Sequence, residues 1–154
     1  MKTTNILPFL FCIFMGIGLM SCNTPRFTGQ TVMHKTTEAG KLSVIASGYG
    51  NLEYISVKNG IQNAFRNILL TGIPGSNQST PLLGKNAEKA YKSNKKFLDN
   101  LIENEVDAFV LEQKNSRFKF FKINTPSSEV ELLINIASLR SHLEQNGIIR
   151  EFGF

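Results

Sequence analysis

The sequence predicts an α+β fold: a two-layer sandwich in which about three helices cover one face of a four-stranded, mainly antiparallel sheet. Three observations predict it. Apolar residues alternate along four segments, as in strands with one buried face. Three other segments carry apolar stripes at helical spacing. Short polar links join the last three strands, which indicates a meander and the order β-α-α-β-β-β-α.

The first strand and the first helix are predicted around a glycine-rich turn. Residues 41–47 alternate, and Gly48-Tyr49-Gly50 ends this strand. Asn51 is the predicted N-cap of the following helix. Its apolar stripe comprises Tyr54, Val57, Ile61, Ala64, Phe65 and Ile68. Gly60 lies inside the helix, where a glycine costs up to about 1 kcal/mol relative to alanine. A closely packed neighbour over Gly60 is therefore expected.

The end of this helix and a second helix follow. Gly72-Ile73-Pro74 predicts a stop with Gly72 in the left-handed conformation and Ile73 folded back on Ile68. Residues 75–83 are predicted to form a loop, and residues 87–102 one continuous helix. The apolar face of this second helix comprises Ala87, Ala90, Tyr91, Phe97, Leu98, Leu101 and Ile102.

The C-terminal half is predicted to contain strands at residues 106–112, 117–123 and 129–136 and a helix at residues 138–146. Residues 149–154 are predicted to form an apolar tail that docks on the domain. Lys114-Asn115-Ser116 is the predicted link between the first two of these strands. Gly147 is predicted to stop the helix, with Ile148 folded back on Leu143.

The first 22 residues have a charged start and an apolar run. Lys2 precedes an uncharged apolar segment over residues 6–20, which ends in Leu19-Met20-Ser21-Cys22. This pattern, with its lipobox at residues 19–22, resembles the precursors of bacterial lipoproteins. The resemblance implies that residues 1–21 are a cleaved signal peptide and that Cys22 carries a diacylglycerol. A retained signal anchor, a secretory signal cleaved elsewhere and a buried helix are the alternatives.

The residues after Cys22 indicate where such a protein would lie. In this class an Asp directly after the cysteine retains the protein in the inner membrane, and here the position is Asn23. Residues 23–26 contain no acidic residue of the kind that directs some lipoproteins to the cell surface. The resemblance therefore implies an outer-membrane protein that faces the periplasm, attached to the membrane through lipid on Cys22.

The mature chain is divided into a flexible tether at residues 22–40, which is polar, and a single domain at residues 41–154. Val32 and Met33 leave open a short edge strand within the tether. Loss of Lys2 lowers the net charge from +5 to +4, which is too small to indicate nucleic-acid binding. Cys12 is lost with the signal, so lipidation of Cys22 leaves no free thiol.

The search for catalytic chemistry predicts no enzyme, no metal and no cofactor. The two histidines, His34 and His142, are interpreted as structural, and no pair of His or Cys residues has metal-ligand spacing. The acidic residues are interpreted as solvated, either in a turn or on a strand face: Asp99, Glu103, Glu105 and Asp107, and the pair Glu129 and Glu131.

A row of lysines is the surface feature that remains. Lys85, Lys89, Lys92 and Lys96 recur at spacings of three and four, which places them on one face of the predicted second helix, beside Lys95. One interpretation is a solvated face. The other is a surface for anions, either phospholipid head groups or an acidic partner protein.

Two functions of different kinds follow as hypotheses. The first is a non-catalytic anchoring or scaffold subunit of an envelope assembly such as a secretion system. Gly48-Tyr49-Gly50 and Gly72-Ile73-Pro74-Gly75 resemble the small α/β domains of Bacteroidota-type envelope lipoproteins and secretion accessory proteins. The alternative is a binding module for peptidoglycan or another glycan, which requires an exposed aromatic side chain among Tyr49, Tyr54 and Tyr91.

Overall fold

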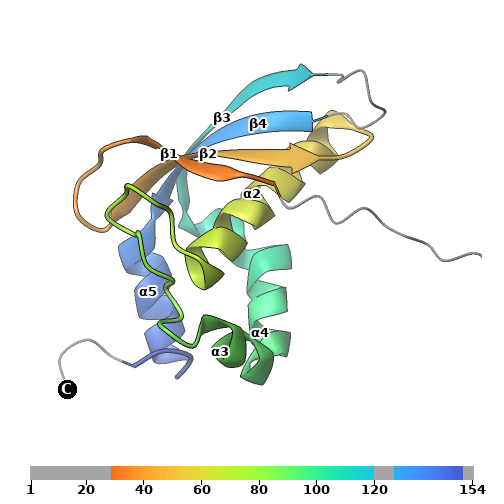
Figure 1. The fold of residues 1–154 in the computed structure, drawn as a ribbon. Helices are drawn as coiled ribbons and strands as arrows, with labels where there is room; N and C mark the ends of the chain where they lie inside the picture. Colours follow the sequence, from red (N-terminus) through yellow and green to blue (C-terminus); the bar gives the residue numbers. More distant parts are fainter. Residues whose placement is uncertain (1–28, 120–126, 151–154) are drawn as a thin grey trace, which may run out of the picture.

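The computed structural model describes residues 29–119 and 127–150 (Figure 1). Four antiparallel strands form one sheet in the order β1-β2-β4-β3, and the helices lie on one face of it. The predicted α+β sandwich is therefore confirmed. The strands are β1 (Thr31–Lys35), β2 (Lys41–Tyr49), β3 (Val110–Lys119) and β4 (Ser127–Asn135).

The order of the elements differs from the predicted order in two places. Residues 31–35, assigned to the tether with an edge strand left open, form β1, which pairs with β2. The predicted strands at 106–112 and 117–123 are not separate, because Lys114-Asn115-Ser116 continues through β3 and pairs with β4. These three residues include no glycine to make a tight turn, and Asn115 pairs with Val130 instead. Residues 120–123 lie outside the described chain.

The central helix α2 (Glu53–Leu70) lies across β2 and β4. Its buried side chains include Val57, Ile61, Phe65 and Ile68, as predicted. The expected close neighbour of Gly60 is present: a Cβ on Gly60 would lie 3.1 Å from Val130 Cγ1 and 3.3 Å from the Gly48 amide nitrogen. The backbones of β2 and α2 thus meet at two glycines.

The start of α2 corrects two predictions. Its N-cap is Leu52 rather than Asn51, and no side chain caps it. Tyr54, predicted within the buried stripe, is exposed, because it lies in the first turn beyond the cover of the sheet and the other helices. The Ser56 hydroxyl is buried and lies 2.5 Å from the Ser128 hydroxyl on β4. This hydroxyl pair joins the start of the helix to the sheet.

The end of α2 follows the prediction in part. Gly72 has a φ of +75°, and its amide donates to Asn67 O at 2.8 Å. The Ile73 amide donates to Gln78 O at 2.8 Å, so it pairs within the loop rather than with the helix. Leu82 N donates to Ile68 O at 2.9 Å, which fastens the end of the loop to α2.

The predicted second helix is not continuous. It breaks at Asn94, where φ is −117° and ψ is 26°, and the Asn94 amide side chain donates to Ala90 O at 3.0 Å. Asparagine forms such local bonds readily, which explains why the chain turns there. The segment comprises α3 (Ala87–Ser93), α4 (Lys95–Asn100), the π-helical turn η1 (Leu101–Glu105) and the 3₁₀ turn η2 (Val106–Phe109).

The last helix, α5 (Ile136–Gln145), follows β4 directly. Its N-cap is Asn135, whose side chain accepts a hydrogen bond from Ser138 N at 2.9 Å. The predicted stop is confirmed: Gly147 has a φ of +67°, and Ile148 N donates to Leu143 O at 2.9 Å. Ile149 packs against the core, whereas Phe152 and Phe154 of the predicted docking tail lie outside the described residues.

Candidate functional site

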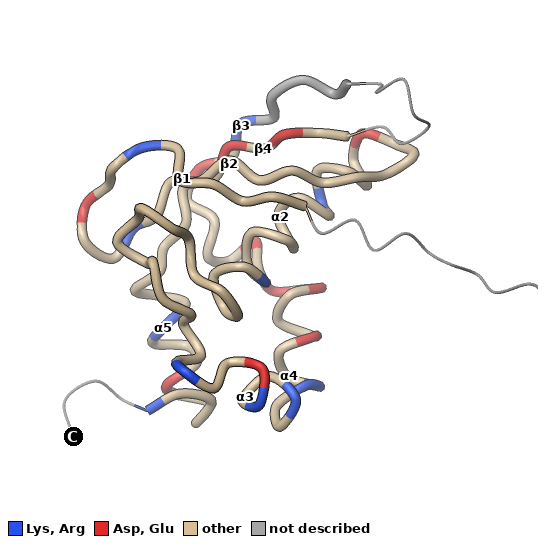
Figure 2. Tube along the Cα trace, viewed as in Figure 1, with Lys and Arg blue, Asp and Glu red and all other residues tan. Residues whose placement is uncertain are grey.

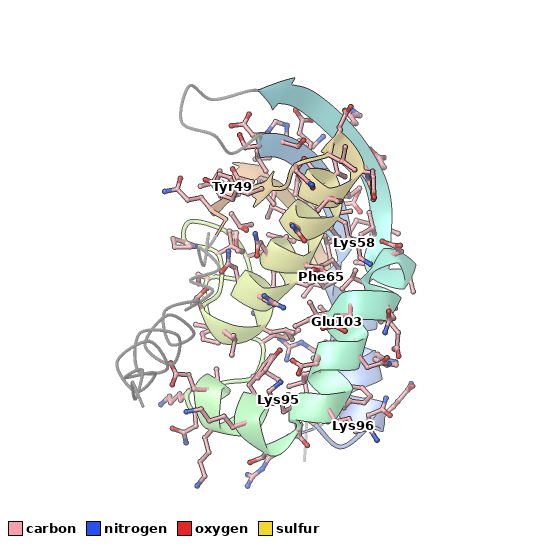
Figure 3. The ribbon with its side chains drawn as sticks, turned by 90° about the vertical axis from the view of Figure 1, so that its right-hand side faces the viewer. Tyr49, Lys58, Phe65, Lys95, Lys96 and Glu103 are labelled. Atoms are coloured by element: carbon pink, nitrogen blue, oxygen red, sulfur yellow. The ribbon has the colours of Figure 1, made fainter. Side chains whose placement is uncertain are left out.

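A concavity of about 900 Å³ opens between the start of α2, the turns η1 and η2, and β3. We call it the α2–η1 groove. Figure 3 shows Lys58 on α2 and Glu103 on η1, which belong to opposite walls of this groove. Its lining residues are Leu52, Glu53, Tyr54, Val57, Lys58, Ile61, Gln62, Glu103, Asn104, Val106, Asp107 and Gln113.

The groove has an apolar floor and an exposed apolar rim. Val57, Ile61 and Val106 are almost completely buried, and they form its floor. The side chains of Tyr54 and Leu52 line the groove at 70% and 48% exposure, respectively. Such residues lose water-exposed apolar area when a partner covers them, which makes this rim a candidate contact surface.

The charge of the groove is opposite in sign to that of the whole chain. Three carboxylates, Glu53, Glu103 and Asp107, line it together with one lysine, Lys58, whereas the chain has a net charge of +5. Carboxylates along a concave surface attract cationic groups more strongly than isolated surface carboxylates do. The groove therefore suits a ligand or partner segment with a positive charge beside an apolar group.

A cluster of aromatic rings supports the wall that carries η1. His142 on α5 stacks on Phe97 at 5.7 Å between ring centroids, and it lies 5.4 Å from the Phe109 ring. Its Nε2 is 3.5 Å from Glu105 Oε2. The Phe109 ring also lies 6.4 Å from Phe65 on α2. Through these ring contacts His142 joins α5 to α4 and η2, in keeping with its structural interpretation.

The four acidic residues interpreted as a solvated turn, Asp99, Glu103, Glu105 and Asp107, have different surroundings in the structure. Glu103 and Asp107 face the groove, whereas Glu105 accepts a hydrogen bond from the Asn100 side chain and lies 3.5 Å from His142 Nε2. Asp99 instead accepts hydrogen bonds from Lys95 and from Tyr91, the latter at 2.6 Å. These two bonds hold the pKa of Asp99 below its usual value. The loop between α3 and α4 is closed by this contact rather than by a shared acidic site.

Tyr91 is the other half of that contact. Burial, followed by the hydrogen bond to Asp99, raises the pKa of the Tyr91 hydroxyl to about 12. The phenol therefore stays protonated and donating at neutral pH. The hydrogen bond from Tyr91 to Asp99 joins α3 to α4 across the break at Asn94. Tyr91 therefore makes a structural contact and is not a candidate aromatic residue for ligand binding.

The break at Asn94 also separates the predicted lysine row. Lys85, Lys89 and Lys92 line a concavity of about 780 Å³ beside α3, together with Leu70 and Pro81. We call it the lysine concavity. Lys96 instead lines a different concavity with Lys95, Phe97 and Asn100. Figure 2 shows the cationic residues gathered around α3 and the start of α4. The single four-lysine face is thus corrected to three lysines on one surface and Lys96 on another.

The remaining predicted site residues lie elsewhere. His34 on β1 and Glu131 on β4 approach at 3.8 Å across β2, on the sheet face opposite the helices. Cys22, the predicted lipidation site, lies outside the described residues. Within residues 29–119 and 127–150, no three metal-ligating side chains of the His, Cys, Asp or Glu type gather at one point. In the same ranges, every helix is too short or too polar to cross a bilayer.

Sequence reasoning missed the groove because its two walls come from features that the residue pattern does not encode. Tyr54 falls on the apolar stripe of α2 and was therefore expected to be buried. The opposite wall exists because the chain breaks at Asn94 and then widens into the π-helical turn η1. Leu52 was not a usable signal, because the sequence favours the neighbouring Asn51 as the N-cap.

Comparisons with known proteins identify no relative. No protein-family model matches the chain, and neither a curated protein nor a solved structure matches it at a significant level.

Proposed function

We propose that this protein is an outer-membrane lipoprotein, anchored through lipid on Cys22 and facing the periplasm, whose domain holds another envelope protein without catalysing a reaction. The lipobox at residues 19–22 supports the anchor. The observation that carries partner binding is Tyr54, a tyrosine with 70% exposure on the rim of the α2–η1 groove. A secretion system is one envelope assembly that would contain such a subunit.

The groove offers the components of an energetic contact. Tyrosine is enriched among residues that dominate interface energies, because its rigid ring buries a large area and its hydroxyl remains able to hydrogen-bond. Leu52 lies beside Tyr54 at the start of α2 and adds aliphatic area. Glu103 and Asp107 on the opposite wall would meet a basic residue of the partner.

The test is crosslinking and affinity purification of the lipidated protein from membrane extracts, with Tyr54→Ala compared with the wild type. We expect the partner to be lost from the variant while the melting temperature stays the same, because the Tyr54 side chain is largely outside the core. Leu111→Ala is the matched control, since Leu111 is exposed to 48% on β3 and does not line the groove. Equal recovery of the partner with both variants would refute this role of the groove.

A glycan ligand is the second candidate, and the same tyrosine favours it. Sugars bind concave sites where an aromatic face stacks on the ring and carboxylates accept from its hydroxyls, and the groove offers Tyr54 with Glu53 and Glu103. The chain has 3 tyrosines and no tryptophan, so its fluorescence comes from tyrosine, and comparison with Tyr54→Ala isolates the contribution of this surface. Saturable change on titration with soluble peptidoglycan fragments, absent in Tyr54→Ala, would favour the glycan over the protein partner.

A further inference from the structure

In the structure, the folded domain begins earlier in the chain than the end of the predicted tether at residue 40. The Gln30 carbonyl accepts from Ser47 N at 2.8 Å, and Asn67 Nδ2 donates to Thr31 Oγ1 at 2.9 Å. Gly29 packs so closely on β2 that an added Cβ would lie 1.8 Å from Ser47 O. The chain is therefore held against the sheet and α2 from Gly29 onward.

This leaves a short connection between the lipid and the domain. Seven peptide bonds separate the Cα atoms of Cys22 and Gly29, and a chain of this length spans at most about 25 Å when fully extended. A domain of about 120 residues is roughly 35 Å across. Whatever conformation residues 22–28 adopt, the domain cannot turn Gly29 to the side far from the membrane if Cys22 is lipidated.

The surface beside Gly29 is the edge strand β1, and it carries exposed apolar side chains. Val32 is exposed to 53% and Met33 to 36%, and Lys35 at the end of the strand is exposed as well. β1 pairs with β2 along one side only, so its other edge is free among the described residues. Apolar residues beside a lysine match the boundary between acyl chains and anionic head groups.

We infer that the β1 edge is the surface with which the domain rests on the lipid bilayer. The inference rests on the proposed lipid anchor, because the seven-residue connection acts only if Cys22 carries lipid. Val32 and Met33 then enter the head-group boundary, and Lys35 faces lipid phosphates. The backbone groups of the free β1 edge stay in the hydrated head-group layer, where water and phosphate oxygens satisfy them.

This orientation determines which surfaces remain open to the periplasm. β3 is at the opposite edge of the sheet from β1, and the α2–η1 groove includes a β3 residue. α3 and α4 lie at the end of the molecule away from the sheet (Figure 1). The groove is thus presented to a partner.

The experiment uses the absence of free thiols in the predicted mature chain, in which Cys12 is removed and the sulfur of Cys22 is alkylated. Single variants Met33→Cys, Val32→Cys and Leu111→Cys are labelled with an environment-sensitive nitrobenzoxadiazole dye. Each full-length lipoprotein is reconstituted into vesicles of phosphatidylethanolamine and phosphatidylglycerol, with or without brominated acyl chains. Leu111 is the matched control, since it is exposed on the opposite edge strand.

We expect brominated lipid to quench the dye at positions 32 and 33 at least twofold more than the dye at position 111. Equal quenching at all three positions, in protein whose intact mass shows the lipid on Cys22, would overturn the inference and leave the anchor intact. A mass without lipid would instead overturn the anchor, and this inference with it. The two failures are therefore distinguishable in the same samples.

A second variant tests the role of the short connection. Fifteen Gly and Ser residues inserted between Thr28 and Gly29 give the domain freedom to leave the surface. We expect quenching at position 33 to fall toward the level at position 111. Undiminished quenching in the extended protein would overturn the argument that the connection holds β1 against the membrane.

Discussion

The two halves of the helical layer are held in different ways. α2 packs on β2 and β4 through direct backbone approach at Gly48 and Gly60, and its packed face is apolar apart from Ser56. The chain from α3 to η2 changes helix type repeatedly between Ala87 and Phe109, and side-chain pairs hold it in place in addition to its buried apolar residues. These pairs are Tyr91 with Asp99 and His142 with the rings of Phe97 and Phe109.

The comparison indicates where the fold tolerates change. The close backbone contact leaves no room for a side chain, so the packing of α2 on the sheet requires glycine at the contact. A segment held by polar and aromatic pairs loses about 1 kcal/mol for each pair removed. The α2–η1 groove lies where these two halves meet, with one wall on α2 and the other on η1.

The largest expected effect comes from Gly48→Ala. A Cβ at this position would lie 1.9 Å from Ser56 O and 2.2 Å from Gly60 N, both backbone atoms that cannot move without displacing α2. We expect a loss of about 3 kcal/mol or more in the free energy of unfolding, measured by urea denaturation. Gly75→Ala is the control: no atom lies within 4 Å, so only its φ of +79° is strained, at about 1–2 kcal/mol. A smaller loss at Gly48 than at Gly75 would contradict the backbone contact.

The same difference explains how much the sequence could predict. The strict alternation of β4, the Gly60 contact and the Gly147–Ile148 stop were predictable, because each depends on the size or period of neighbouring residues. The break at Asn94 depends on one side chain that bonds Ala90 O in competition with the helix. The unbroken helix α2 contains Asn59, Asn63 and Asn67, so residue type alone could not locate the break.

The candidate site was predictable to a smaller extent. The lysine spacing was correct in the sequence, yet the break at Asn94 separates Lys96 from Lys85, Lys89 and Lys92. The groove depends on contacts between segments far apart in the chain, such as Tyr54 on α2 and Asp107 on η2. Such pairings follow from packing, and no local period encodes them.

A moderate effect is expected at the buried hydroxyl pair in the α2 half. Ser56→Ala leaves the Ser128 hydroxyl buried without its 2.5 Å partner, so we expect a loss of about 1–3 kcal/mol in unfolding free energy. Adding Ser128→Ala removes the unpaired group, and the double variant should recover part of the loss. Purely additive losses in this double-mutant cycle would show that the hydroxyls do not interact.

A smaller, pH-dependent effect is expected in the α3–η2 half. Tyr91→Phe removes the hydrogen bond to Asp99 and should cost about 1 kcal/mol at pH 8. The folded pKa of Tyr91 is about 12, above the usual 10, so this stabilisation is present below pH 10 and is lost as the pH rises toward 12. Unfolding measured from pH 8 to 12 should therefore show the wild type and the variant converging. A constant difference across this range would contradict the role assigned to the phenol.

The smallest effect separates two neighbouring lysines. Lys95 pairs with Asp99, and its hydrogen bond is the main cause of the lowered pKa of that carboxyl. Lys95→Gln should raise the pKa of Asp99 in an NMR titration, whereas Lys96→Gln, at the neighbouring residue of α4, should leave this pKa unchanged. Because the pKa of Asp99 is lowered in the folded state, the ion pair stabilises the protein above pH 3.8, and this contribution is lost as the pH falls through the folded pKa.

The loss of this ion pair in Lys95→Gln should cost about 0.3–0.5 kcal/mol of unfolding free energy at low salt. This cost should vanish in 1 M salt, since both side chains are solvent-accessible. An equal shift from both variants would mean that general positive charge at the start of α4, rather than the Lys95 contact, sets the ionisation of Asp99.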